Sequence, residues 1–314
     1  GDVYKRQDYI WGGTRLRDEY GKKCDYDKVA ESWELSCHKD GPSVVADGEY
    51  KGLTLNEYIE KAGKGVLGKN CERFENFPIL IKLIDAKDNL SVQVHPDNDY
   101  AMRVEGEYGK TEMWYVVDCD EGATLLYGFK HEITKEEFAR RIADNTLLEV
   151  TNAVPVKKGD VFFIKSGTLH AIGKGILIAE IQQNSNTTYR IYDYGRVGKD
   201  GKPRELHVNK ALDVTKLAPA EQYPETPVEK KDGYDIKLLS KCEYFTTYRV
   251  NVETKAELDA DENSFNSILV LEGEPVISGG ETVSAKKGES VFISAGTGKY
   301  TVEGKCTFVL TKID

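Results

Sequence analysis

Short runs of strand-forming residues, each ended by a turn signal, limit how this chain can fold more than any other feature. Such runs lie at residues 116–117, 125–127, 161–164 and 176–181, each rich in Val, Ile, Leu, Phe or Tyr. The 29 glycines supply turns, and the 18 tyrosines suit half-buried strand surfaces. Strands this short and this closely spaced predict a β-sandwich or a β-barrel.

Helix signals are sparser and fall between these runs. Residues 55–59 follow Thr54, and Thr134 with Glu137 has the Thr-x-x-Glu form of a capping box ahead of residues 138–142. We therefore expect a mainly β protein with a small helical insertion in its first half.

A proline-rich, charged segment divides the chain. Residues 217–233 contain three of the nine prolines and alternating charges, which is the composition of a linker. We expect one domain over residues 1–216 and a second β domain over residues 234–314. Residues 1–7, GDVYKRQ, have neither an initiator Met nor the apolar core of a secretory signal, and we interpret them as a truncated or artefactual start.

The two predicted domains share a sequence signature. The segment 157–170 reads KKGDVFFIKSGTLH, and the segment 286–299 reads KKGESVFISAGTGK in the same register. This match is either a chance recurrence of a common turn-strand-turn pattern or the trace of a duplicated β-sandwich. In the second case the first copy keeps His170 where the second has Lys299, and the chemistry is confined to the first copy.

Charge and cysteine usage exclude several classes of protein. With 43 basic and 53 acidic residues the net charge is −10, which argues against a nucleic-acid partner. No apolar run approaches the roughly 18 residues of a membrane span. The six cysteines are scattered without a CxxC pair, which predicts free thiols in a reducing compartment. We expect a cytoplasmic protein without a membrane partner.

Polar residues in three segments could form a metal site. In the segment 90–97, LSVQVHPD, alternation places Ser91, Gln93 and His95 on one strand face, as in a strand that lines a wet cavity. A lone strand histidine is more often structural than a ligand. His170, however, follows a glycine turn that can aim it into a sandwich, and Glu112 begins an aromatic strand. Two imidazoles, a carboxylate and an amide oxygen suit Zn²⁺ or a similar divalent ion, although no HExxH motif is present.

Two further charged residues are candidates for chemistry. Arg190 lies in a polar stretch between strands, where a surface ion pair is the simpler explanation. Glu180 lies within the apolar run 176–181, where burial can raise a carboxyl pKa into the range of proton transfer. The other histidines, His38, His131 and His207, have polar neighbours in the sequence, and we predict that they are solvated.

Six sequence blocks occur in a fixed order between about residues 9 and 215. They are YIWGG at 9–13, ESWELS at 31–36, SVQVHPD at 91–97, GKTEMWY at 109–115, GTLHA at 167–171 and YR at 189–190. Together they resemble the type I mannose-6-phosphate isomerases of the cupin superfamily, particularly the shorter bacterial form. The resemblance implies two cupin-type β-sandwich, or jelly-roll, domains and an enzyme that interconverts mannose 6-phosphate and fructose 6-phosphate with one zinc ion per chain.

The resemblance also implies a role for each polar residue of the blocks. It implies zinc ligands at Gln93, His95, Glu112 and His170, an active-site arginine at Arg190, substrate contacts at Lys110 and Ser91, and an acid/base glutamate at Glu180. The sequence departs from the family pattern at Lys165, where cupins usually have a proline. Residues 234–314 offer no ligand set, which implies a degenerate cupin-like domain.

Aldose-ketose isomerisation moves a proton between C2 and C1 and passes through an enediolate. We expect zinc and Arg190 to stabilise the developing charge and Glu180 to carry the proton. Lys110, assisted by Arg190, is the first candidate for holding the substrate phosphate. Two alternatives stay open at this point: a cupin isomerase or epimerase for another sugar phosphate, and a non-catalytic sugar-binding cupin. The resemblance favours a monomer or a weak homodimer.

Overall fold

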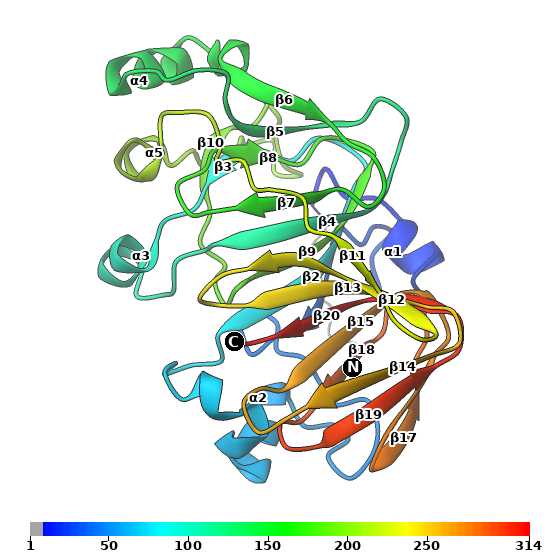
Figure 1. Cartoon of the computed structure of the whole chain (residues 1–314). Coiled ribbons are helices and arrows are strands. Elements are labelled where there is room, and N and C mark those ends of the chain that lie inside the picture. The colour runs from blue at the N-terminus through cyan, green and yellow to red at the C-terminus, as the bar shows by residue number, and fades with distance from the viewer. Residues whose placement is uncertain (1–8) are drawn as a thin grey trace.

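Two β-sandwich halves make up the protein (Figure 1), which confirms the mainly β, cupin-type prediction. The structure is a computed structural model that describes residues 9–314; the predicted artefactual start at residues 1–7 lies outside the described residues. The four predicted strand runs all lie in strands of the first half.

The first half consists of two five-stranded antiparallel sheets. One sheet has the order β1-β2-β9-β4-β7, with bounds Glu31–Leu35, Ile79–Ala86, Ile176–Gln183, Glu112–Cys119 and Val161–Ile164. The other has the order β10-β3-β8-β5-β6, with bounds Tyr189–Tyr192, Val92–Val94, His170–Ala171, Thr124–Phe129 and Thr151–Pro155. Trp114 and Ile178 of the first sheet pack with Leu125 and Tyr127 of the second in one apolar cluster.

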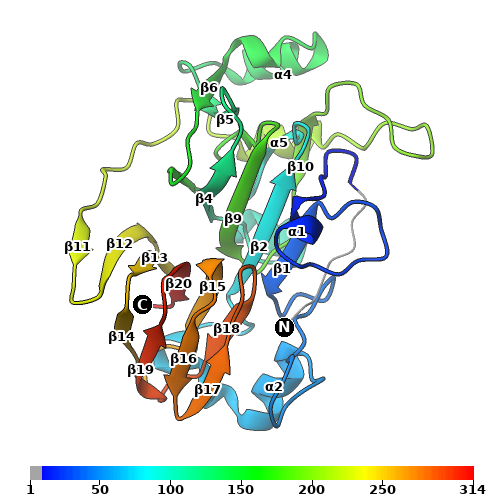
Figure 2. The ribbon, with the colours of Figure 1, turned by 90° about the vertical axis from the view of Figure 1, so that its right-hand side faces the viewer.

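The second half repeats the sandwich plan with sheets of unequal size. Its six-stranded sheet has the order β11-β12-β13-β20-β15-β18, with bounds Val228–Lys230, Tyr234–Lys241, Thr246–Val252, Cys306–Lys312, Asn266–Gly273 and Ser290–Ile293. Its four-stranded sheet has the order β14-β19-β16-β17, with bounds Lys255–Ala260, Gly298–Glu303, Val276–Gly279 and Glu281–Ser284. Strand β11 falls inside the predicted linker, and the chain before it runs along the outside of the molecule (Figure 2). The position of the domain boundary stays a prediction.

Short helices connect the strands of the first half. They are α1 (Arg15–Asp18), α2 (Leu55–Ala62), η1 (Lys64–Leu67), η2 (Lys69–Cys71), α3 (Asn98–Val104), α4 (Lys135–Ala143), η3 (Leu147–Glu149) and α5 (Val208–Val214). Thr54 and Thr134 accept hydrogen bonds from the backbone of Glu57 and Glu137, so both predicted helix starts are confirmed. Helices α3 and α5 carried no strong sequence signal. No helix of residues 9–314 is both long and apolar enough to cross a membrane.

One apolar cluster spans the two halves. Along β2, the side chains of Ile79, Ile81 and Leu83 point away from the first sandwich and pack in one cluster with Leu269 and Val309 of the second half. Because successive strand residues face opposite sides, Lys82 and Ile84 point inward. Strands β2 and β9 are consequently buried along their whole length. The inward face of this sheet is where the polar residues of the candidate site lie.

Candidate functional site

A polar cavity of about 260 Å³ lies between the two sheets of the first half. Both sheets contribute to its walls, because β1, β2 and β9 line one side and β3 and β10 line the other. Its polar lining includes Glu31, Lys82, Ser91, Gln93, Lys110, Glu180, Arg190 and Arg204. Four of the residues proposed from the family resemblance, Ser91, Lys110, Glu180 and Arg190, therefore share this cavity with Gln93.

Strand pairing brings these residues together from distant parts of the chain. In the first sheet Trp33 pairs with Lys82, Lys82 with Glu180, and Glu180 with Trp114, so these four side chains form a row across the sheet. Directly paired residues project from the same face of a sheet. Of this row, Lys82 and Glu180 line the cavity, and the two tryptophans flank them.

A second row of paired residues lies on the other sheet. There Arg190 pairs with Gln93, and Gln93 pairs with His170. His95, two residues after Gln93, is buried beside His170, and its ring centroid lies 4.7 Å from that of His170. The antiparallel register thus places Gln93 between the histidine pair and Arg190.

His95, Glu112 and His170 form a buried cluster of potential metal ligands. Their ring nitrogens and carboxylate oxygens all lie within 4.8 Å of one another. The Nε2 atoms of His95 and His170 are 3.1 Å apart, and the Glu112 carboxylate lies 3.6 Å and 3.4 Å from them. Within residues 9–314, no other group of three His, Cys, Asp or Glu side chains meets in this way.

The hydrogen bonds of the two imidazoles indicate what this cluster lacks. His95 Nδ1 lies 3.0 Å from the Thr187 carbonyl oxygen, and His170 Nδ1 lies 2.8 Å from that of Thr168. A carbonyl oxygen only accepts, so each Nδ1 carries the proton and each Nε2 presents a lone pair. Two facing lone pairs and a carboxylate, one of whose buried oxygens has no hydrogen-bond partner, require a cation between them. The donor set therefore fits a divalent metal, with backbone carbonyls orienting the histidines.

Lys110 supplies a positive charge next to this cluster. Its Nζ lies 3.3 Å from His95 Nε2, 3.2 Å from Glu112 Oε2 and 3.9 Å from Glu180 Oε1. Burial and the Lys110 charge lower the pKa of His95 to about 3. Burial would raise the pKa of Glu112, but Lys110, His95 and His170 together outweigh it and hold that pKa well below its usual range. Both groups are therefore in the deprotonated form that a metal needs at neutral pH.

Glu180 occupies a different environment on β9. Its Oε2 accepts a hydrogen bond of 2.9 Å from Trp114 Nε1, whereas its buried Oε1 has no hydrogen-bond partner and lies 3.7 Å from Lys82 Nζ. Burial, followed by the negative charge of Glu112, raises the pKa of Glu180 to about 7. A carboxyl group with this pKa can both take up and release a proton near neutral pH.

The remaining predicted residues sit around these groups. Ser91 is buried and Gln93 is half-buried, and both line the cavity. Arg190 donates from Nη1 to the Glu205 carbonyl oxygen at 2.9 Å, while its buried Nε has no hydrogen-bond partner in the described chain. Lys165, the departure from the cupin pattern, is exposed, and its Nζ lies 3.8 Å from Glu221. The geometry is compatible with the predicted roles, which stay predictions.

One sequence prediction about the histidines was wrong. His38 is buried instead of solvated, because its ring packs edge-on against Trp33 and hydrogen-bonds to Glu107, which lies far from it in the sequence. His131 is exposed as expected, and His207 is half-buried at the start of α5.

Among the residues that sequence reasoning missed are Lys82 and Arg204, which line the cavity, and Trp114, which donates to Glu180. Lys82 stands in the apolar run ILIKLIDA as Glu180 stands in ILIAEIQQ, so the same signal of a charge inside a buried strand could have identified it. Trp114 was noted only as part of an aromatic strand. Arg204 lies in an irregular segment after β10, where no local pattern marks it.

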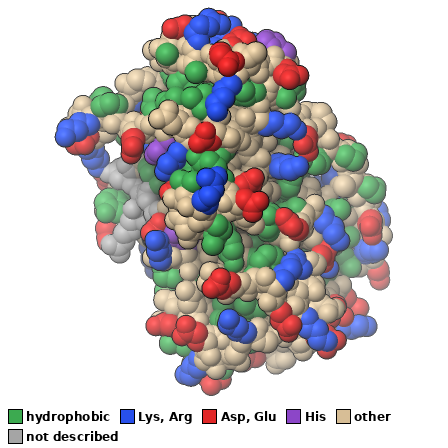
Figure 3. Space-filling view, turned by 90° about the vertical axis from the view of Figure 1, so that its left-hand side faces the viewer, with side chains coloured by type: hydrophobic (Ala, Val, Ile, Leu, Met, Phe, Trp, Pro, Cys, Tyr) green, Lys and Arg blue, Asp and Glu red, His purple; other side chains and the backbone are tan. Residues whose placement is uncertain are grey.

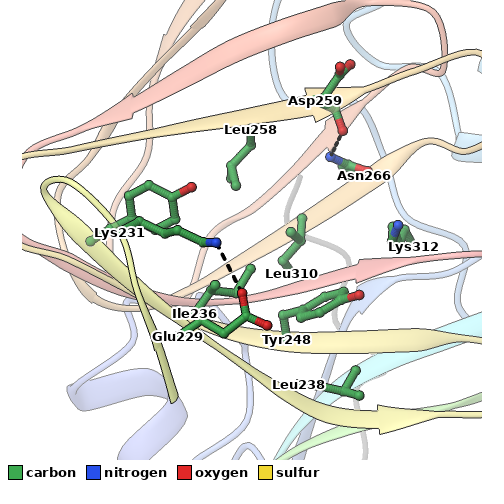
Figure 4. Close-up of a pocket in the computed structure, with 11 residues that line it drawn as sticks. Glu229, Lys231, Ile236, Leu238, Tyr248, Leu258, Asp259, Asn266, Leu310 and Lys312 are labelled. Carbon is green, nitrogen blue, oxygen red and sulfur yellow. Dashed lines mark hydrogen bonds and ion pairs between the residues drawn. The ribbon is translucent and has the colours of Figure 1, made fainter. Parts of the chain in front are cut away.

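The second half has a cavity of its own with different chemistry. It measures about 320 Å³, and Figure 4 shows its mixed polar and apolar walls, with the Glu229–Lys231 ion pair at 3.2 Å among them. Apolar side chains at its walls include Ile236, Leu238 and Leu310. No histidine or cysteine lines it. The one group of potential metal ligands found among residues 9–314 thus lies in the first half.

Comparisons with known proteins agree with this placement. Residues 4–122 match the family profile "Phosphomannose isomerase type I, catalytic domain", and residues 235–313 match "Mannose-6-phosphate isomerase, cupin domain". The mannose-6-phosphate isomerase ManA of Bacillus subtilis is 39% identical over 99% of this chain and 97% of its own length. The mannose-6-phosphate isomerase of Streptococcus mutans is 40% identical over 90% of this chain and 88% of its own.

Solved structures show the same likeness. The crystal structure of the mannose 6-phosphate isomerase from Bacillus subtilis superposes with a TM-score of 0.91 at 37% identity and covers 99% of both chains. The apo form of the Salmonella typhimurium enzyme superposes with a TM-score of 0.77 over 100% of this chain and 98% of its own, and at 17% identity it shows the fold alone.

Proposed function

The chain belongs to the type I mannose-6-phosphate isomerases, in their short bacterial form, and from this premise we propose that it interconverts mannose 6-phosphate and fructose 6-phosphate with a bound zinc ion. The observation that carries the proposal is a buried group of potential metal ligands, His95, Glu112 and His170, whose lone pairs face one another. Beside it lies Glu180, which has a pKa near neutrality. A sugar-binding protein would need the polar cavity but would have no use for a buried carboxyl group of this kind.

The zinc ion would be held by His95, Glu112 and His170, with the amide oxygen of Gln93 as a fourth ligand. Neutral imidazoles, a carboxylate and an amide are ligands that zinc accepts, and a single ion per chain is expected. When bound, the ion polarises the oxygens on C1 and C2 of the open-chain sugar and so makes the adjacent C–H bond more acidic.

Glu180 would move the proton between C2 and C1. Its Oε1 has no hydrogen-bond partner and is therefore available to the substrate, while the bond from Trp114 Nε1 fixes Oε2. Because one oxygen is fixed and the other is available, the carboxylate can take the proton from one carbon and return it to the neighbouring one. The buried site limits exchange of that proton with water.

Positive charges around the cavity would stabilise the enediolate. Lys110 lies next to the proposed metal ligands, where its ammonium can contact an oxygen of C1 or C2, and Ser91 offers a hydroxyl at the cavity wall. Arg190 presents its unpartnered Nε from the opposite sheet. Fixed charges of this kind lower the barrier because they need no reorganisation when the negative charge develops.

A coupled assay of fructose 6-phosphate formation tests this function. We expect turnover of mannose 6-phosphate, little turnover of glucose 6-phosphate or unphosphorylated mannose, and roughly one zinc per chain by elemental analysis. Chelation should abolish the activity, and added zinc should restore it. Full activity of metal-free protein would contradict the zinc assignment, and selective turnover of another sugar phosphate would identify an isomerase or epimerase with a different substrate.

Matched histidine variants connect the activity to the cluster. His95→Ala should lose bound zinc and turnover together, because it removes one of the converging nitrogens. His131→Ala is the control, since that side chain is exposed and lies outside the cavity. Equal zinc content in the two variants would remove His95 from the ligand set. Sedimentation analysis would test the expectation of a monomer or weak homodimer.

A further inference from the structure

The buried histidine His38 has a carboxylate partner that the proposed chemistry does not use. His38 Nδ1 accepts from the backbone N–H of Asp40 at 3.1 Å, so Nε2 carries the proton and donates to Glu107. The ring also packs edge-on against Trp33, with the two ring centroids 5.7 Å apart. Neither His38 nor Glu107 lines the cavity. Any effect of this pair on the site must therefore pass through a third segment.

That segment is the loop of residues 184–188, which joins β9 to β10. Glu107 Oε1 accepts from the backbone N–H of Asn186 at 3.1 Å, and Glu107 Oε2 accepts from the Thr187 hydroxyl at 2.9 Å. Asp40 accepts from the side-chain amide of Asn186 at 3.0 Å. His38 and Glu107 lie 69 residues apart in the sequence, yet their two segments hold the same part of this loop.

The 184–188 loop orients one of the potential metal ligands. The carbonyl oxygen of Thr187 accepts from His95 Nδ1 at 3.0 Å, which turns Nε2 of His95 toward the cluster. Glu107 thus holds the residue that supplies this carbonyl and also the residue before it. A displaced loop would turn the His95 ring or lengthen its hydrogen bond. His170 is independent of this arrangement, because its Nδ1 lies 2.8 Å from the carbonyl oxygen of Thr168.

Glu107 is itself held in place by the backbone around it. It lies between α3 and β4, where the chain passes close to the residues before α3. An added Cβ on Gly109 would lie 2.4 Å from the carbonyl carbon of Asp97, and Gly109 N donates to Asn98 Oδ1 at 2.9 Å. The segment that carries Glu107 therefore has little freedom to move, which suits an anchor.

The charge state of Glu107 suits the same role. Burial would raise the pKa of Glu107, but the hydrogen bonds from His38, Thr187 and the Asn186 backbone outweigh it and lower that pKa. An ionised carboxylate only accepts hydrogen bonds, so it can take all three at once. A protonated carboxyl group would have to give one of them up.

We infer that Glu107 is a positioning residue for the potential metal ligand His95, acting through the 184–188 loop, and that His38 holds Glu107 in turn. The inference rests on the proposed function, because it takes His95 to be a zinc ligand. Neither residue lines the cavity, so their effect should appear in the affinity for the metal, and in turnover only through loss of the metal.

Zinc titrations against a competing chelator test the role of Glu107. Glu107→Ala should bind zinc about 10-fold more weakly than the wild type, the lower end of the loss expected when the partners of a metal-bound histidine are disturbed. Glu107→Gln should keep most of the affinity, because its amide can donate to the Thr187 hydroxyl while its oxygen accepts from His38 and Asn186. In the same way, His38→Gln should bind zinc more tightly than His38→Ala.

Glu105→Ala is the matched control. The side chains of Glu105 and Glu107 are exposed to similar extents, 27% and 25%. The hydrogen bonds of Glu105, with Tyr189 at 2.9 Å and Lys210, lead away from the 184–188 loop. Its zinc affinity should therefore equal that of the wild type. Equal losses in Glu105→Ala and Glu107→Ala would indicate a general structural defect and overturn the positioning role.

Thr187→Val tests the route through the loop with a change that keeps the side-chain shape. It removes the hydroxyl that donates to Glu107 but leaves the carbonyl that accepts from His95. Its loss of zinc affinity should be smaller than that of Glu107→Ala, and adding it to Glu107→Ala should cost nothing further, because the bond is already absent. Fully additive losses would refute the route through Thr187.

Cobalt(II) in place of zinc gives a spectroscopic readout that does not need turnover. The visible absorption of the cobalt protein should change in Glu107→Ala, because the His95 ring is no longer fixed, and should match the wild type in Glu105→Ala. On the face drawn in Figure 3, acidic and basic side chains are interspersed without a broad acidic patch, so that face offers no competing site for the added metal.

The outcomes separate this inference from the proposed function. A wild type that binds no zinc and fails to isomerise mannose 6-phosphate would refute the proposed function. An active, zinc-loaded wild type whose Glu107→Ala variant keeps the wild-type zinc affinity and cobalt spectrum would refute the role of Glu107 alone.

Discussion

A substitution at Gly68 can test how closely the backbones of the two halves approach each other. It precedes η2, has φ of 89° and ψ of 167°, and an added Cβ would lie 2.4 Å from the backbone carbonyl of Asn263 in the second half. Backbone hydrogen bonds surround this contact, from Lys69 N to Glu262 O at 3.1 Å and from Asn70 N to Asn263 O at 2.9 Å. The substitution Gly68→Ala therefore forces two paired backbone segments apart.

Gly63 serves as a control, because it has a similar backbone conformation without the close contact. Gly63, at the end of α2, has φ of 91° and ψ of 147°, but an added Cβ there would meet nothing within 4 Å. The conformation itself costs an alanine about 1–3 kcal/mol at either position. Gly68→Ala should cost about 1–3 kcal/mol more, the usual penalty of overpacking.

Thermal unfolding makes the comparison measurable. For a chain of 314 residues that unfolds as one unit, an unfolding entropy of about 2.1 cal/mol/K per residue means that 1–3 kcal/mol lowers Tm by about 2–5 °C. Gly68→Ala should melt lower than Gly63→Ala by this amount, while isomerase activity at 25 °C is kept because neither glycine lines the cavity. Equal melting temperatures would refute the close approach of the two segments.

Two more predictions concern buried charges. In chelated protein, Glu180 has a folded pKa of about 7 against an ordinary value of 4.5, so the stability that its protonated form contributes is present below pH 4.5 and is lost as pH rises through 7. Glu180→Gln cannot ionise, so its free energy of unfolding should rise by on the order of 3 kcal/mol relative to that of the wild type between pH 4.5 and pH 8. Urea unfolding measures this difference at each pH. A difference that does not change with pH would contradict the shifted pKa. Lys22 Nζ donates to buried Glu34 at 2.9 Å and to the Gly288 carbonyl oxygen of the second half at 2.6 Å. Lys22→Met should cost about 3–5 kcal/mol because it leaves Glu34 buried without this charge, and Lys22→Met combined with Glu34→Met should recover most of it; a double variant as unstable as the single one would show that the pair itself is stabilising.

Local patterns were sufficient to predict several strands of the first half and part of the cavity. Alternation along residues 90–97 placed Ser91, Gln93 and His95 on one face, and a charge inside an apolar run singled out Glu180. The side on which each strand faces is a local property. Which strands are neighbours is not, and the row from Trp33 through Lys82 to Glu180 depends on pairing between segments some 50 to 100 residues apart along the chain. The environment of His38 was mispredicted for the same reason, because Glu107 approaches it only in the folded chain.

The arrangement of charge explains how an acidic protein can select a dianionic substrate. At the end of the cavity beside the potential metal ligands, Lys82 and Lys110 are each within ion-pair distance of a carboxylate. At the other end, Arg190 has no carboxylate partner among residues 9–314, whereas Arg204 pairs with Asp193 and Arg196 pairs with both Asp193 and Asp88. A sugar without a phosphate would gain nothing from the unmatched charge of Arg190, and a phosphate bound beside the potential metal ligands would face Glu180 and Glu112. We therefore expect the unmatched charge of Arg190, and not the net charge of −10, to govern how an anionic substrate enters the cavity.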